Sequence, residues 1–158
     1  MPESTQASGA LAVVHELLSS TNLLTSEEPI EGGRRFRITL DGPAEEGTIE
    51  VHTDLERVAL ALVFPSPVPQ KRRSAMAKLI GYINWGLMEG AFALSLDSGQ
   101  LCYKAGFGYA GTTLPGPLVR NALLTGMETI ELFVDAIVDV ANGASQPRAA
   151  YERAKRRA

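Results

Sequence analysis

A helix end that runs directly into an alternating hairpin constrains this chain more than any other part of its sequence. The segment Asn84–Gly90 ends a helical pattern, and Ala91–Leu96 and Leu101–Tyr103 then alternate large and small side chains. A tight two-residue turn between these strands would place Leu94 opposite Tyr103. The stretch therefore predicts an architecture, a hairpin beside a helix, and contains no pattern typical of a catalytic centre.

Apolar periodicity predicts the remaining elements. Phe36, Ile38 and Leu40 alternate with polar residues as in a half-buried strand, and Leu123 to Ile137 repeat at helical spacing. The order of elements is α-β-β-β-α-β-β-α, which predicts an α+β fold with one antiparallel sheet packed against helices. We expect helices near residues 8–20, 71–88 and 117–142, and strands at 35–40, 48–53, 58–64, 91–96 and 101–103.

The strand at Val58–Phe64 is apolar on both faces. A strand of this kind lies in the middle of a sheet or at an interface with another molecule. The hairpin face that carries Ala93 and Cys102 is shallow and offers a second contact surface. We therefore predict a homodimer, with the dimer or partner interface formed by Val58, Leu60, Leu62, Phe64, Trp85, Phe92 and Leu94.

Length and composition indicate one globular domain. A chain of 158 residues buries roughly 70% of its unfolded surface on folding. The sequence lacks an apolar run near the ~20 residues that span a bilayer and opens without a secretory pattern, so we expect a cytoplasmic protein that does not enter membranes. Cys102 is the only cysteine, which makes an intrachain disulfide impossible and predicts a packed, inert thiol.

Positive charge is concentrated in two places. Residues 146–158 carry a net charge of +4 and residues 1–145 carry −7. This basic tail is predicted to be flexible, and phosphate, an anionic partner, nucleic acid or the chain's own acidic body could contact it. A second cluster, residues 71–73, begins a helix where the helix dipole favours anions, so it is either solvated or bound to an anion or partner. The candidate anion or nucleic-acid contacts are Arg148, Arg153, Lys155, Arg156 and Arg157.

Gly106–Gly111 fits the glycine spacing of a dinucleotide-binding fingerprint. That mechanism needs a parallel strand after the following helix, and only the tail remains beyond Asn142. We therefore interpret the glycines as the point where a strand bends into a helix, with phosphate at the helix N-terminus as the enzyme alternative. His15 and His52 lack metal-ligand spacing. No catalytic residue, metal or cofactor is predicted.

One pattern resembles a known family. Asn84, Gly90, Phe92, Asp97 and Gly99, followed by Leu101 and Tyr103, resemble the YbjN family of bacterial sensory transduction regulators. The resemblance runs from the first helix to about Asn142 and implies a single YbjN-like domain over residues 1–145, outside which the basic tail lies. It also implies the fold of type III secretion chaperones and, usually, a homodimer.

The resemblance implies no catalytic residues. It implies a non-enzymatic protein-binding module, a chaperone-like or regulatory adaptor that holds a flexible or extended segment of another protein. The sequence leaves two alternatives open. One is an accessory factor in nucleic-acid handling that acts through the basic tail or through a nucleic-acid-binding client, although direct nucleic-acid binding is not favoured. The other, less favoured, is an enzyme that binds a phosphate-bearing ligand at Gly106–Gly111.

Overall fold

The computed structural model describes residues 2–158. Helices and one antiparallel sheet form an α+β fold, as the sequence predicted. The helices are α1 (Pro2–Ser20), α2 (Arg73–Gly86, preceded by the 3-10 turn η1 at Gln70–Arg72), α3 (Gly116–Ala141) and α4 (Pro147–Arg157). The strands are β1 (Leu24–Ile30), β2 (Gly33–Thr39), β3 (Glu46–His52), β4 (Arg57–Val63), β5 (Ala91–Leu94) and β6 (Leu101–Gly108).

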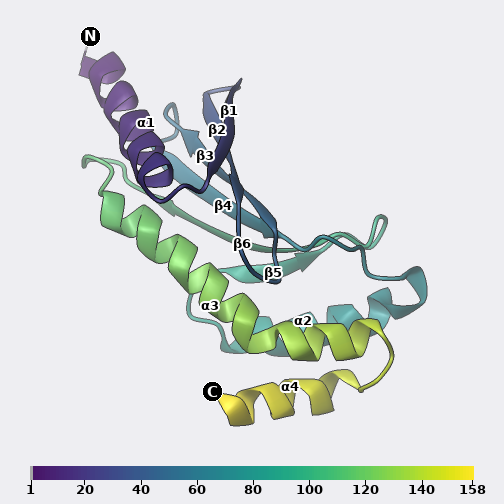
Figure 1. The fold of residues 1–158 in the computed structure, drawn as a ribbon. Coiled ribbons are helices and arrows are strands. Elements are labelled where there is room, and N and C mark those ends of the chain that lie inside the picture. The colour runs from purple at the N-terminus through teal and green to yellow at the C-terminus, as the bar shows by residue number, and fades with distance from the viewer. Residues whose placement is uncertain (1) are drawn as a thin grey trace.

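The six-stranded sheet has the order β1-β2-β3-β4-β6-β5 (Figure 1). The first four strands form successive hairpins, and α2 then carries the chain to β5, so that β6 returns between β4 and β5. Every neighbouring pair is antiparallel. This topology leaves β1 and β5 as the two edge strands, and the edge at β5 is the part that matters for the site.

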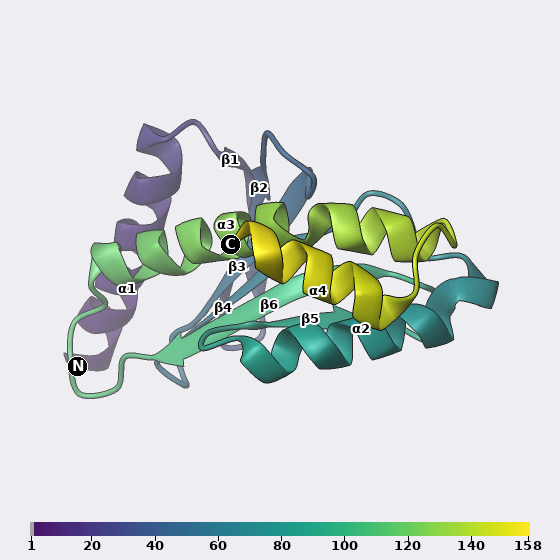
Figure 2. The same ribbon diagram turned by 90° about the horizontal axis from the view of Figure 1, so that it is seen from below.

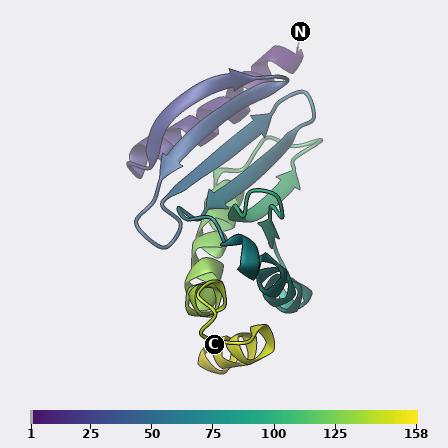
Figure 3. The ribbon, with the colours of Figure 1, turned by 90° about the vertical axis from the view of Figure 1, so that its right-hand side faces the viewer.

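The helices lie against one face of the sheet (Figures 1 and 3). Alternate strand residues point to that face, because side chains in a strand alternate between its two sides. They meet the apolar stripes of α1 and α3, represented by Val14 and Ile130, both of which are buried. Gly126 lets α3 approach closely, since a Cβ atom there would lie 2.8 Å from the ring of Tyr103. The core lies between this face and the helix layer.

One strand, β1, was missed by the sequence prediction, which placed no strand before residue 35. It pairs with β2 in register Glu28↔Arg35 and Ile30↔Gly33. Glu28 accepts hydrogen bonds from Arg35 and Arg37, so charge pairing across the sheet supports a strand that has little apolar surface. A hydrophobic alternation test could not detect it.

The β5–β6 hairpin is also shorter than predicted. Leu94 pairs with Leu101 and Phe92 with Tyr103, a shift of two residues from the predicted register. A wider loop replaces the two-residue turn, held by the bond from the Ser95 N–H to the Gln100 carbonyl. A shift of two keeps the same side chains on the same face, so the predicted inward face of the hairpin is correct.

Residues 146–158, predicted as a flexible tail, mostly form α4. Ala150 and Ala154 are buried, and the ring of Tyr151 stacks on those of Tyr82 in α2 and Phe133 in α3. Figure 2 shows α4 lying across α2 and α3 on their side away from the sheet. The structure therefore corrects the prediction, because small and aromatic residues between the charges give this segment a packing face.

Candidate functional site

Most of the predicted interface residues lie inside their own chain. Val58, Leu60 and Leu62 of β4 and Phe92 of β5 are all buried. The mid-sheet position of β4 explains its two apolar faces, since both of its neighbours are strands and one face supports the helices. Burial leaves these four side chains no surface to offer to another molecule. The structure therefore corrects the interface assignment at these positions.

The remaining interface candidates keep some exposure. Phe64 and Leu94 are half-buried, and Trp85 is 92% exposed at the end of α2. Three residues later, Met88 is 99% exposed. Two large apolar side chains that project so far into solvent are typical of a surface that contacts another molecule. The corner between α2 and β5 is therefore the part of the predicted interface that the structure leaves accessible.

Beside this corner, β6 extends past the end of β5. Phe64 donates its N–H to the Leu101 carbonyl at 3.0 Å, and Tyr109 donates to the Glu56 carbonyl at 2.8 Å. In an antiparallel pair such bonds alternate, so the odd-numbered residues of β6 bond to β4. The even-numbered residues therefore point their N–H and C=O groups toward the β5 side.

That side is occupied only as far as Lys104. Ala91, the first residue of β5, pairs with Lys104, and no strand within residues 2–158 continues along Gly106 and Gly108 on this side. The chain before Ala91 turns away at Gly90, whose φ is +67°. We call the side of residues 105–108 that faces away from β4 the open edge of β6. Its exposed peptide groups can form the hydrogen bonds of one more strand.

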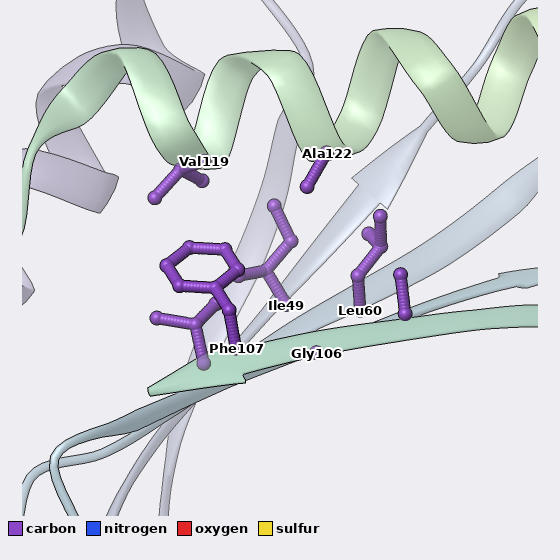
Figure 4. A pocket seen from close by; sticks show the side chains of 8 residues that line it. Ile49, Leu60, Gly106, Phe107, Val119 and Ala122 are labelled. Carbon is purple, nitrogen blue, oxygen red and sulfur yellow. The ribbon is translucent and has the colours of Figure 1, made fainter. Parts of the chain in front are cut away.

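A groove lined by both apolar and polar atoms runs along the open edge. Ala105 and Phe107 line it from β6, Ala122 and Thr125 from α3, and Met88 from the α2–β5 corner, around a volume of about 250 Å³. Figure 4 shows the space between β6 and α3 next to this groove, where Phe107 points from β6 toward α3. We call this the edge groove. It places apolar side-chain contacts directly next to unpaired backbone groups.

The adjoining part of the same sheet edge is closed. The Asn84 amide donates to the Phe92 carbonyl and accepts from the Phe92 N–H, both at 2.9 Å. A side-chain amide thus takes the place of a neighbouring peptide group. Tyr103 strengthens this corner, because its hydroxyl donates to the Glu89 carbonyl at 3.4 Å. Strand addition at β5 would first have to displace Asn84.

The basic cluster at the beginning of α2 binds carbonyl groups of its own chain. Arg72 donates to the Val140 carbonyl near the end of α3 at 2.8 Å, where the helix dipole favours a cation. Arg73 donates to the carbonyls of Val68, Leu96 and Asp97 and so fixes the β5–β6 loop. The sequence had left open solvation or a contact with an anion or a partner for this cluster, whereas Arg72 and Arg73 bind carbonyl groups of their own chain.

The candidate basic contacts of α4 are largely engaged as well. Arg153 pairs with Asp139 and Arg157 with Asp135 of α3, at 3.0 and 2.7 Å. Arg148 pairs with Glu152 inside α4. Lys155 and Arg156 are exposed and form no ion pair with a described side chain. The chain's own acidic body is thus the main partner of this basic segment.

The helix-free face of the sheet divides into a charged half and a small-residue half. In the charged half, Arg35 bonds to Glu28 and Glu50. Burial acts to raise the pKa of Glu50, but hydrogen bonds from Arg35 and His52 outweigh it and leave that pKa below its usual value. Burial raises the pKa of Cys102 in the other half, which disfavours the reactive thiolate.

The other sequence motifs do not converge into a reaction centre. All strand pairs are antiparallel, so β6, Gly106–Gly111 and α3 are not part of a dinucleotide-binding βαβ unit. His15 and His52 each contact one carboxylate, Glu27 and Glu50. Over residues 2–158, no cluster of three candidate metal ligands forms. In that same range, no helix is both long and apolar enough to cross a membrane.

The sequence analysis considered Gly106–Gly111 as a strand bend or a phosphate site, and did not predict a peptide-binding edge there. The signal of this edge in the sequence is the strand that continues to Gly108 while its partner begins only after Gly90. No protein-family model matches this chain, and no significant match exists among curated proteins. The resemblance to the YbjN family therefore stays a prediction, and the site stands on its geometry.

Proposed function

We propose that this protein is a non-enzymatic binding module that holds an extended segment of another protein at the open edge of β6. The observation that carries the proposal is the pair of outward-facing peptide groups, Gly106 and Gly108, beside the edge groove. An added strand would satisfy these groups and insert alternate side chains between Met88 and α3. This is the adaptor or chaperone-like activity that the family resemblance implies, in a protein that we propose to be cytoplasmic.

The accessible apolar surface supports the proposal. Met88 lines the groove and Trp85, three residues earlier in the chain, is 92% exposed, and aromatic and methionine side chains are enriched at protein interfaces. Glycines at the edge permit close approach of a second backbone, because they carry no side chain on the helix-free face. Homodimerisation also remains a proposal. Light scattering at micromolar concentration tests it, and a monomer would contradict it.

The proposed strand addition can be tested at Gly108. We would select peptides from a displayed random library on the immobilised protein and measure their affinity by fluorescence anisotropy. Gly108→Pro removes an N–H that faces the open edge and should weaken binding about tenfold, the equivalent of one lost backbone hydrogen bond plus the bulk of the ring.

Gly108→Ala is the matched control. It keeps the N–H, and an added Cβ atom would lie no closer than 3.6 Å to its nearest neighbour. We expect this variant to bind like the unmodified protein. Recovery of no binding peptide, or equal affinity for the alanine and proline variants, would rule out strand addition at this edge.

A further inference from the structure

A second hollow lies on the opposite flank of α3. Its floor consists of Leu40, Ala44, Leu62 and Ile130, all of them buried. Leu124 of α3, 43% exposed, stands at its mouth. The turn between β2 and β3 forms the facing wall, and the enclosed volume is about 200 Å³. The α3 helix therefore separates this hollow from the edge groove.

Three carboxylates surround the apolar floor. Asp41 lies in the β2–β3 turn, and Glu128 and Glu131 lie on α3. None of the three carboxylates forms an ion pair with a described side chain. No lysine or arginine lines the hollow. Glu128 and Glu131 are also neighbours on one helix face, so their charges repel each other.

The next acidic residues along α3 differ from these three carboxylates, because they form ion pairs. Asp135 and Asp139 are neutralised by Arg157 and Arg153 of α4. On the flank that faces the hollow, the nearest cation on α3 is Arg120, roughly 12 Å along the axis from Glu128. Solvent ions screen an exposed charge at that distance. The hollow is thus an apolar pocket whose three rim carboxylates form no ion pair with a described side chain.

We propose that this acidic hollow binds a basic segment of a partner protein, one that carries a large apolar side chain flanked by lysine or arginine. Charge complementarity identifies the occupant, since a neutral or acidic segment would leave the rim repulsion in place. Size agrees with a single anchor. A cavity of roughly 150 Å³ accepts a benzene molecule, whereas small-molecule sites start at about 300 Å³.

The probe for this site is a fluorescein-labelled peptide with a central Leu-Trp pair flanked on each side by two lysines. One comparison peptide carries glutamate in place of lysine, and another carries Gly-Ser in place of Leu-Trp. Anisotropy titrations should show binding of the lysine peptide that weakens with added salt, and much weaker binding of both comparison peptides.

Two variants test the hollow, and each has a matched control. Glu128→Gln with Glu131→Gln should weaken binding about tenfold, as expected for two exposed ion pairs. The control pair, Glu16→Gln with Glu31→Gln, removes the same charge from other exposed positions. Leu124→Ser should weaken binding at least about fivefold, as expected when an apolar contact is lost. Leu118→Ser is its control, on the same helix and 46% exposed.

Failure of the lysine peptide to bind would overturn the proposal, as would equal losses in the control variants. This inference goes beyond the proposed function and is tested apart from it. Gly108→Pro should leave binding of the lysine peptide unchanged. A loss in that variant would place the peptide at the open edge and remove the assignment to the acidic hollow.

Discussion

Phe92 and Gly106 lie along the same edge of the sheet, but the peptide groups of Phe92 are hydrogen-bonded and those of Gly106 that face this edge are not. Asn84 forms hydrogen bonds with both the N–H and the carbonyl of Phe92. Because β5 reaches only as far as Lys104 along β6, no strand pairs with Gly106 and Gly108 on this edge. Unpaired strand edges invite association, and proteins usually cover them. This molecule covers one half of an edge with a single side chain and leaves the other half bare. The unpaired half of the edge is therefore a short segment, limited by the hydrogen bonds of Asn84 and by the turn at Gly90.

The largest expected effect comes from the residue that separates the two halves. Gly90 has a positive φ, and a Cβ atom there would overlap the Tyr103 hydroxyl. Gly90→Ala should lower the free energy of unfolding by about 3 kcal/mol, from backbone strain plus overpacking. Urea denaturation measures the change.

Gly111→Ala is the matched control for Gly90→Ala. Gly111 also has a positive φ, of +78°, but a Cβ atom there would meet no other atom within 4 Å. The difference between the two variants isolates the contact with Tyr103. Equal losses would show that the boundary depends on backbone conformation alone.

A smaller effect should follow when the closed half is opened. Asn84→Ala removes both hydrogen bonds to Phe92 and should cost about 2 kcal/mol of stability. The variant should also self-associate more readily, because it exposes a second stretch of edge. Chemical denaturation and light scattering measure these effects. Asn121→Ala, at an exposed position on α3, should change neither, and a silent Asn84→Ala would show that the amide does not protect the edge.

The smallest effect should come from the hydroxyl beneath the corner. Tyr103→Phe removes the bond to the Glu89 carbonyl and should cost about 1 kcal/mol at neutral pH. Burial first, and the Glu89 charge second, raise the pKa of Tyr103 above its usual value of 10.0. The unfolded chain therefore loses this proton more easily, so stability falls as the pH rises above about 10.

The loss of stability at alkaline pH provides a second test of the role of Tyr103. Phenylalanine at position 103 cannot ionise, so Tyr103→Phe should reduce the loss of stability at alkaline pH. Part of that loss should remain, because burial also raises the pKa of Tyr109. Thermal unfolding between pH 8 and 11 follows both. An unchanged alkaline slope would mean that Tyr103 ionises equally well in the folded protein.

The sequence predicted those elements whose stability comes from apolar burial. Phe36 and Ile38 alternate as their burial requires, and the stripe of α3 contains the core residue Ile130. The sequence prediction missed those elements that are stabilised by charge pairing or by the packing of small residues. β1 depends on Glu28 and its arginine partners, and the basic character of α4 obscured the packing of Ala150.

The candidate site was harder to predict for a different reason. Apolar strand residues such as Leu62 suggested an interface, but whether a side chain meets solvent depends on strand order, which hydrophobic pattern does not encode. Trp85, predicted to lie at an interface, is 92% exposed, and its role at an interface stays a prediction. The open edge depends on where β5 ends relative to β6, and element boundaries are the part of a sequence pattern that is least well defined.

The order of α2, α3 and α4 along the chain matters for biosynthesis. Rings in α2 and α3 that Tyr151 covers are translated before it, so a nascent chain carries Tyr82 and Phe133 without their final neighbour. Domains fold from the N-terminus onward during synthesis. The rings of Tyr82 and Phe133 therefore stay without this neighbour on the nascent chain until α4 has been synthesised.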